Sequence, residues 1–194
     1  MKKIPTLFKR VFEGKKKVDI LDEITPGCEE AFKNGVATVK YDGSCCAIIE
    51  GELYKRYDAK NGKTPPANSF PCCAPDPITG HWPHWVPVDA TSPADKWFVA
   101  AAEYTFGSGT IPCIDYQTFE AVGPHFNGNP TNYTEDHLIP HGEDIIYECE
   151  MERTFEGVRK WLENHEVEGI VFWLNGEPVC KIKRSDFGLS WPVK

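Results

Sequence analysis

Residues 36–57 read VATVKYDGSCCAIIEGELYKRY. Two short breaks, at Asp42-Gly43-Ser44 and at Gly51, divide this stretch into three runs whose composition is typical of strands. Because both breaks are tight, we expect three consecutive strands that form a small antiparallel meander. The pattern places these strands at residues 36–41, 45–50 and 52–57.

Similar local signals predict the other regular elements. The dipeptide Asn175-Gly176 is typical of a tight hairpin turn, and apolar residues flank it on both sides. Thr154 is suited to cap a helix whose apolar face begins with Phe155. Further strands are expected at 114–122, 167–174 and 178–183, and helices between Pro26 and Gly35, near 93–105, and from Thr154 onward.

The chain has 194 residues, enough for one hydrophobic core, and we expect a single domain over residues 1–194. No stretch approaches the roughly 20 apolar residues of a membrane-spanning helix, and Lys9 and Arg10 interrupt the apolar run that a secretion signal requires. Eight cysteines without such a signal indicate reduced thiols. We therefore expect an intracellular protein, in the cytoplasm or nucleus of the source or host cell, without membrane contact. We also expect a monomer.

The formal net charge is −8, which excludes a uniformly basic surface for nucleic acid. Any polyanion must then bind at a local patch. One candidate is a basic N-terminal arm at residues 1–24, for which a solvated charged end is the alternative. Its cations are Lys2, Lys3, Lys9, Arg10, Lys15, Lys16 and Lys17.

Residues 61–91 are rich in Pro, Gly, Asn and Ser, and we expect a long surface loop without regular structure. Trp82 and Trp85 within it are interpreted either as stacking partners for bases or as cover for a sheet edge. The segment also contains residue types that bind zinc, although adjacent cysteines are an awkward start to a tetrahedral site, and free thiols are the alternative. These residues are Cys72, Cys73, His81 and His84.

Lys40 ends the first predicted strand, just before the turn at Asp42-Gly43. A lysine acts as a nucleophile only when its amine is neutral, so its ordinary pKa of about 10.4 must be lowered by burial or by neighbouring cations. A strand end that faces other cations meets this condition. Lys40 is therefore a candidate nucleophile, and an exposed strand lysine is the alternative.

Lys181 and Lys183 alternate along the last predicted strand, so their ammonium groups share one face. Two like charges this close repel each other unless an anion such as a phosphate lies between them. Glu168 on the neighbouring strand can supply the oxygen ligand that Mg²⁺ prefers. The alternative is an exposed hairpin with a cross-strand Glu–Lys pair.

In this order, the segments resemble the motifs of the covalent nucleotidyltransferase superfamily of ligases and capping enzymes. The matching stretches are Lys40 to Gly43, Arg56 after the next strand, Phe119 to Gly123, Glu168-Gly169, and Lys181 to Lys183. Within the superfamily, the chain is most similar to the small RNA ligases that seal 5′-phosphate to 3′-hydroxyl ends, the family that includes the human RNA ligase. The stretches that resemble this family are residues 35–40, 42–46, 138–142 and 183–188.

The resemblance implies an α+β fold, namely an antiparallel-sheet nucleotidyltransferase domain of the ATP-grasp-like adenylation type with flanking helices. It also implies that Lys40 attacks the α-phosphorus of ATP and forms a lysyl-AMP intermediate. AMP would then pass to an RNA 5′-phosphate, and a 3′-hydroxyl would displace it. The other implied roles are ribose binding by Arg56 and Glu120, charge neutralisation at the α-phosphate by Lys181 and Lys183, and binding of Mg²⁺ or Mn²⁺ by Glu168.

Eleven residues follow Lys183, too few for the C-terminal OB domain of capping enzymes and most DNA ligases, so we expect no OB domain. This favours an ATP-dependent RNA ligase that acts on RNA with 5′-phosphate and 3′-hydroxyl ends. The alternatives are a capping-type guanylyltransferase and a nucleotide- or RNA-binding module without turnover, although binding alone needs no amine aimed at phosphorus. Tyr147 is a candidate to stack on adenine, with a place in the core as the alternative.

Overall fold

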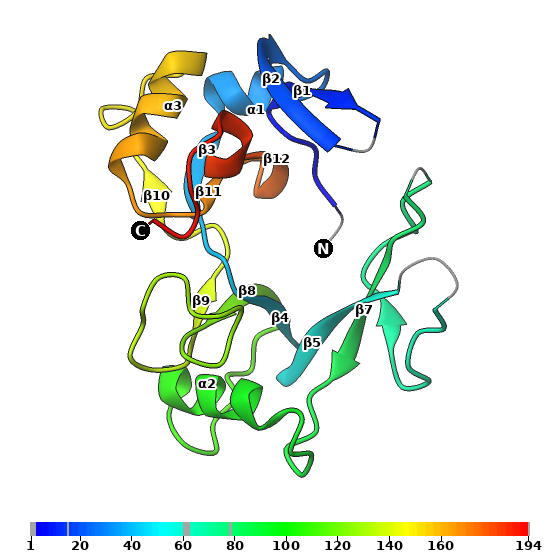
Figure 1. The fold of residues 1–194 in the computed structure, drawn as a ribbon. Helices are drawn as coiled ribbons and strands as arrows, with labels where there is room; N and C mark the ends of the chain where they lie inside the picture. Colours follow the sequence, from blue (N-terminus) through cyan, green and yellow to red (C-terminus); the bar gives the residue numbers. More distant parts are fainter. Residues whose placement is uncertain (1–2, 15, 60–62, 78, 194) are drawn as a thin grey trace. The chain divides into compact units, whose positions relative to one another are not determined.

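The computed structural model describes residues 3–14, 16–59, 63–77 and 79–193 (Figure 1). Lys2 and Lys15 of the predicted basic arm lie outside the described residues. The chain divides into two compact units. The first comprises Met1–Lys3 and Asp42–His141, and the second comprises Ile4–Tyr41 and Gly142–Lys194. That the whole chain forms a single domain stays a prediction.

A six-stranded antiparallel sheet forms the centre of the first unit, in the strand order β6-β7-β5-β4-β8-β9. Helix α2 (Lys96–Phe106) lies against one face of this sheet (Figure 1). On this face, Ala101 and Ala102 pack with Cys46, Phe119 and Leu138. Side chains that alternate with these along the strands therefore lie on the opposite face. The strands are β4 (Ser44–Ile49), β5 (Glu52–Ala59), β6 (Phe70–Pro71), β7 (Trp82–Pro87), β8 (Tyr116–Val122) and β9 (His137–Pro140).

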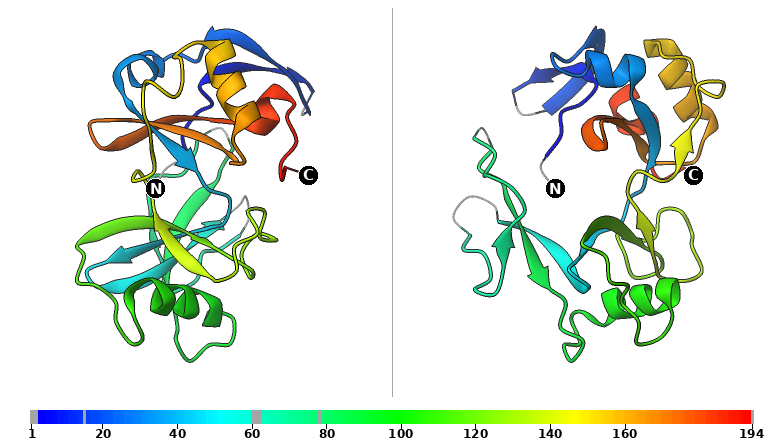
Figure 2. Two further views of the ribbon diagram at one scale, coloured as in Figure 1. Left: turned by 90° about the vertical axis from the view of Figure 1, so that its left-hand side faces the viewer. Right: turned by 180° about the vertical axis from the view of Figure 1, so that it is seen from behind.

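The second unit contains a four-stranded antiparallel sheet in the order β10-β3-β11-β12 and a two-stranded hairpin, β1-β2. Its helices pack with the sheet in one core, in which the Phe32 ring meets Phe8 and Phe172 edge to face at centroid distances of 5.7 and 5.4 Å. Figure 2 shows the helices and the hairpin around this sheet from two further directions. The elements are β1 (Phe8–Glu13), β2 (Lys16–Ile24), α1 (Glu29–Asn34), β3 (Val36–Lys40), β10 (Ile145–Ile146), α3 (Phe155–Asn164), β11 (Gly169–Leu174), β12 (Glu177–Lys183) and the 3₁₀ turn η1 (Arg184–Phe187).

Several local predictions are confirmed. Thr154 caps α3, because its hydroxyl oxygen accepts a hydrogen bond from the Gly157 N–H at 3.0 Å. Asn175 and Gly176 both have positive φ, as the two-residue turn between β11 and β12 requires. The α+β class with antiparallel sheets is also confirmed. No helix among the described residues is long and apolar enough to cross a membrane.

The predicted three-stranded meander is wrong. Strand β3 pairs with β10 and β11, whereas β4 pairs with β5 and β8, so only β4 and β5 form a hairpin. Neighbours in sequence are merely the more frequent partners in a sheet. Both partners of β3 follow it by more than 100 residues, and local sequence carries no signal for such a pairing.

The expected irregular loop over residues 61–91 is wrong for residues 70–71 and 82–87, which form β6 and β7. Prolines suggested a loop because they cannot donate to a ladder. Strand β7 pairs with β5 along its length, but β6 covers only two of its residues, so Pro83 and Pro87 remove few hydrogen bonds. Trp85 is 2% exposed in this sheet, so it contributes to packing and is not available to stack on bases.

Candidate functional site

Three neighbouring strands of the second unit bring the predicted lysines together. In the register of the sheet, Gly169 of β11 lies opposite Lys40 of β3 on one side and opposite Lys183 of β12 on the other. Two residues further along β11, Val171 lies opposite Lys181. Because residues paired in register share a face, Lys40, Lys181 and Lys183 all lie on one face of the sheet.

The carboxylate of Glu168 lies between two of these ammonium groups. Glu168 is 5% exposed, and one of its oxygens accepts a hydrogen bond from Lys40 Nζ while the other accepts one from Lys183 Nζ. Cations that pair with a buried carboxylate in this way offset the cost of burying its charge. Glu168 therefore belongs to the same group of side chains, as the counter-ion of both lysines.

The donor set around Glu168 is small for a metal site. No group of three or more His, Cys, Asp and Glu side chains gathers as metal ligands would in the part of the chain that the structure describes. Mg²⁺ is commonly held by one or two carboxylates together with substrate phosphates. Glu168 fits such an arrangement if phosphates supply the remaining oxygens, and its binding of Mg²⁺ stays a prediction.

The positive charge of Lys181 is disfavoured by its surroundings. Burial, followed by the positive charges of Lys40 and Lys183, lowers its pKa from 10.5 to about 8, although the charge of Glu168 acts in the opposite direction. An anion placed among these lysines would relieve the repulsion. The sequence led us to expect this effect of neighbouring cations at Lys40, and the structure shows it at Lys181.

If a nucleotide phosphate binds among these lysines, the pKa of Lys181 predicts how the affinity depends on pH. Lys181 is protonated below about pH 8 and loses its charge above it. We therefore expect the affinity for an ATP analogue with a methylene bridge between the α- and β-phosphates to fall above pH 8, by at most about tenfold per pH unit. Calorimetric titration from pH 7 to 9.5 measures this.

The variants Lys181→Gln and Lys33→Gln show whether the fall in affinity comes from Lys181 or from the titration of other groups. Lys33 is exposed on α1, so Lys33→Gln should keep the wild-type profile. Lys181→Gln should bind more weakly at pH 7 and lose the decline above pH 8. A decline that persists in Lys181→Gln would assign the titration to another group.

Gly169 allows β11 and β12 to approach each other beside the lysines. A Cβ at this position would lie 2.1 Å from the carbonyl oxygen of Ile182 and 3.0 Å from the Cα of Lys183. Both are backbone atoms, so the strands would have to separate. We expect Gly169→Ala to cost about 1–3 kcal/mol of stability and to lower the melting temperature by roughly 2–12 °C. An unchanged melting temperature in thermal unfolding would contradict this packing.

In the first unit, Arg56 and Glu120 lie on the sheet face opposite α2. Cys45 of β4 lies between them, directly opposite Glu120 of β8 and beside Arg56 of β5. Burial raises the pKa of the Cys45 thiol to about 12, so it stays neutral there. The Nε and Nη2 groups of Arg56 donate hydrogen bonds to the carboxylate of Asp58 at 3.0 and 3.2 Å.

His141 is a site residue to which the sequence assigned no role. Its Nε2 lies 3.0 Å from Glu120 Oε2, and its Nδ1 lies 2.9 Å from Thr118 Oγ1. The other oxygen of Glu120 accepts the backbone N–H of Gly43 at 3.0 Å. Both Glu120 oxygens are therefore held in place. The only signal for His141 was its position within residues 138–142, one of the stretches that resemble small RNA ligases.

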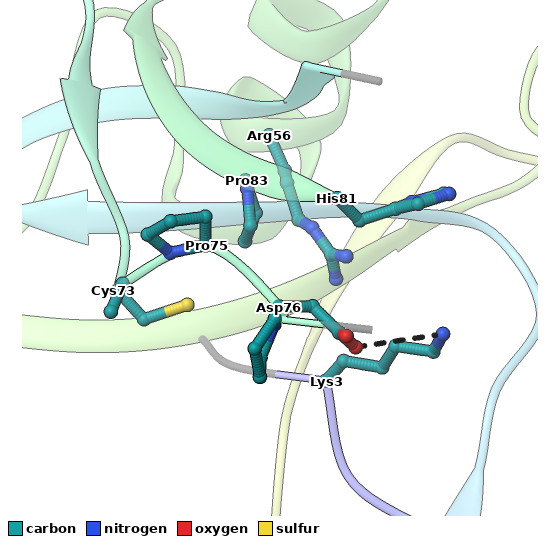
Figure 3. A pocket seen from close by; sticks show the side chains of 9 residues that line it. Lys3, Arg56, Cys73, Pro75, Asp76, His81 and Pro83 are labelled. Carbon is teal, nitrogen blue, oxygen red and sulfur yellow. Dashed lines mark ion pairs between the residues drawn. The ribbon is translucent and has the colours of Figure 1, made fainter. Parts of the chain in front are cut away.

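Arg56 also lines a cavity of about 210 Å³ in the first unit (Figure 3). Its guanidinium points toward Asp76 and Lys3, which form an ion pair at 3.8 Å. Cys73 and His81 lie at opposite ends of this cavity in Figure 3. A zinc site was one interpretation of Cys72, Cys73, His81 and His84. It finds no support, since the described residues contain no metal-ligand cluster of this kind.

The structure excludes one of the two interpretations of Tyr147. The residue is 63% exposed and follows β10, so its assignment to the core is wrong. A role in stacking on adenine stays a prediction.

The predicted site residues thus form two groups, one in each unit. The second unit gathers a candidate nucleophile, two further cations and a buried carboxylate, which are Lys40, Lys181, Lys183 and Glu168. The first unit presents Arg56 and Glu120 on one sheet face. Amines and a carboxylate at this spacing can bind a phosphate and neutralise charge that develops on it.

Known proteins similar to this chain are RNA ligases. RNA ligase 1 of Rattus norvegicus is 26% identical over 229 aligned positions, which cover 82% of this chain and 69% of the relative. RNA ligase 1 of Mus musculus is 26% identical over 226 positions, with the same coverage. RNA ligase 1 of Danio rerio is 31% identical over 140 positions, which cover 59% of this chain and 43% of the relative.

No protein-family model matches the chain. The similarity to the three relatives nevertheless extends over most of its length, and it confirms the resemblance carried by the motifs. The chain is therefore a homologue of RNA ligase 1, an RNA ligase of the nucleotidyltransferase superfamily.

Proposed function

We propose that this protein is an ATP-dependent RNA ligase that seals 5′-phosphate to 3′-hydroxyl ends through a lysyl-AMP intermediate. The observation that carries the proposal is the arrangement around Glu168, whose buried carboxylate is shared by Lys40 and Lys183. Lys181, with its lowered pKa, lies on the same sheet face. Homology to RNA ligase 1 supports the choice of RNA as substrate.

Lys40 is the nucleophile of the first step. Its ammonium group first gives up a proton to solvent, and Nζ then attacks the α-phosphorus of ATP. A P–N bond forms, the nitrogen loses a second proton to solvent, and the bond to the β-phosphate breaks to release pyrophosphate. Lys181 and Lys183 offset the negative charge that develops on the α-phosphate oxygens. When bound at Glu168, Mg²⁺ supplies further charge neutralisation.

Two more transfers complete the reaction. An oxygen of the RNA 5′-phosphate attacks the phosphorus of lysyl-AMP, the P–N bond breaks, and Lys40 is restored. A 3′-hydroxyl oxygen then attacks the RNA phosphate, which forms the phosphodiester bond and releases AMP. Arg56 and Glu120 bind the ribose of the nucleotide in this proposal, and Glu120 is suited to it because both its oxygens are oriented and can accept further hydrogen bonds.

The proposal is tested by incubating the protein with ATP, Mg²⁺ and an RNA that carries a 5′-phosphate and a 3′-hydroxyl. We expect joined RNA that requires ATP and disappears when the 5′-phosphate has been removed. Covalent labelling of the protein by GTP alone would favour the capping-type alternative. Binding of ATP and RNA without any covalent product would favour a module without turnover.

A further inference from the structure

A buried carboxylate lies in η1, the 3₁₀ turn that directly follows Lys183. The side chain of Asp186 is 2% exposed, and its Oδ2 accepts a hydrogen bond from the Lys183 backbone N–H at 2.9 Å. Its Oδ1 accepts a hydrogen bond from Arg10 Nε at 2.8 Å and lies 2.6 Å from Arg10 Nη2. One carboxylate therefore joins strand β1 to the end of β12.

A second cation of the β1-β2 hairpin holds the same turn. Lys17 Nζ donates hydrogen bonds to the carbonyl oxygens of Ser185 and Asp186 at 2.9 and 2.7 Å. From the other side, the buried guanidinium of Arg184 donates to carbonyl oxygens at the C-terminal end of α3. The turn is thus fixed between the hairpin and α3.

These contacts determine where Lys183 lies. Lys183 is the last residue of β12, and its backbone is held by the pairing with Gly169 and by the carboxylate of Asp186. Its ammonium group then reaches Glu168. Because a lysine side chain is flexible, the place of its charge depends on a fixed backbone and a fixed partner. Loss of the Asp186 contact would free the strand end that carries this charge.

We propose that Asp186, held by Arg10, is a positioning residue for Lys183. The inference rests on the proposed function, in which Lys183 neutralises charge on the α-phosphate. It also gives Arg10 and Lys17 of the N-terminal arm a role inside the second unit, instead of the RNA contact considered from the sequence. Lys9 is likewise engaged, since its Nζ pairs with Glu23 at 2.7 Å.

The test is the rate at which the protein acquires AMP from saturating α-³²P-labelled ATP, measured in a single turnover without RNA. This experiment separates the rate constant from the labelled fraction, and a purely structural defect lowers only the labelled fraction and the melting temperature. We expect Arg10→Ala to lower the rate constant about 10- to 100-fold, as a displacement of about 1 Å at a reacting group does. Arg159→Ala, an exposed arginine on α3, is the matched control and should label at the wild-type rate.

Arg10→Lys tests geometry apart from charge. Arg10 contributes positive charge near Lys181, and a lysine at position 10 keeps that charge but lacks the planar fork that places two N–H groups on Asp186. We expect an intermediate rate constant. Asp186→Asn should also be slow, and the double variant Arg10→Ala/Asp186→Asn should be no slower than the slower single variant, because both act through one contact.

The outcomes distinguish this inference from the proposed function. Wild-type rate constants in both Arg10→Lys and Asp186→Asn would overturn the positioning role while leaving the ligase proposal intact. If Arg10→Ala does not fold, these two variants still decide the question. A wild-type protein that acquires no label contradicts the proposed function, and the positioning role falls with it.

Discussion

Lys40→Arg is expected to abolish covalent labelling of the protein by ATP, with the rate lowered more than about 10⁴-fold. The guanidinium stays protonated at any accessible pH and has no lone pair with which to attack phosphorus. It still provides a cation for Glu168, so the fold and the binding of the methylene-bridged ATP analogue should largely persist. Labelling with α-³²P-labelled ATP and denaturing electrophoresis measure the loss.

Lys33→Arg is the matched control for this variant, because Lys33 is an exposed lysine in the same unit. It should label like the wild type. Residual labelling of Lys40→Arg at a rate near that of the control would show that another side chain is the nucleophile.

Glu168→Gln is expected to have the second largest effect, a decrease of about 100-fold or more in the labelling rate. The substitution leaves the ammonium groups of Lys40 and Lys183 without their shared carboxylate. It also removes the negative charge that raises the pKa of Lys181, so this pKa should fall below about 8. Breaking the pair should cost up to about 3 kcal/mol, less than for a fully buried pair because both lysines are partly exposed.

The control for Glu168→Gln is Glu166→Gln, an exposed carboxylate two residues earlier. It should change neither the labelling rate nor the melting temperature. If Glu168→Gln labels at the wild-type rate and requires the same concentration of Mg²⁺, the carboxylate serves neither the lysines nor the metal.

The clustering of Lys40, Lys181 and Lys183 could be predicted in part, because strand alternation and a hairpin turn are local properties. Lys181 and Lys183 share a face through the two-residue period of a strand, and Asn175-Gly176 joins β11 to β12 as a hairpin. The turn alone would place Gly169 opposite Ile182. A register shift between Phe172 and Trp173, for which the sequence carries no signal, brings Gly169 opposite Lys183. Lys40 joins them only through the pairing of β3 with β11. For that step the order of motifs, and not the local sequence, carried the information.

What the sequence did not reveal depends on contacts between distant segments. The ion pair of Arg10 with Asp186 joins residues 176 positions apart, and the pair of His141 with Glu120 joins strands whose pairing no turn announces. The charge pattern of residues 1–24 suggested a basic patch. In the structure Arg10 and Lys17 bind groups within the same unit, which the sequence alone does not show. Strand β7 was missed because it contains prolines, which lack the N–H that pairs in a sheet. How many hydrogen bonds a proline removes depends on whether a neighbouring strand lies along that edge, and this is visible only in the structure.

The central claim, that Lys40 carries AMP during catalysis, is tested most directly by mapping the modification. The wild-type protein is incubated with ATP and Mg²⁺, digested at neutral pH to preserve the acid-labile P–N bond, and analysed by mass spectrometry. We predict a single AMP group on the peptide that contains Lys40, absent when Lys40→Arg is treated identically. AMP on a different residue, or no covalent nucleotide on a protein that still joins RNA with ATP, would contradict the account.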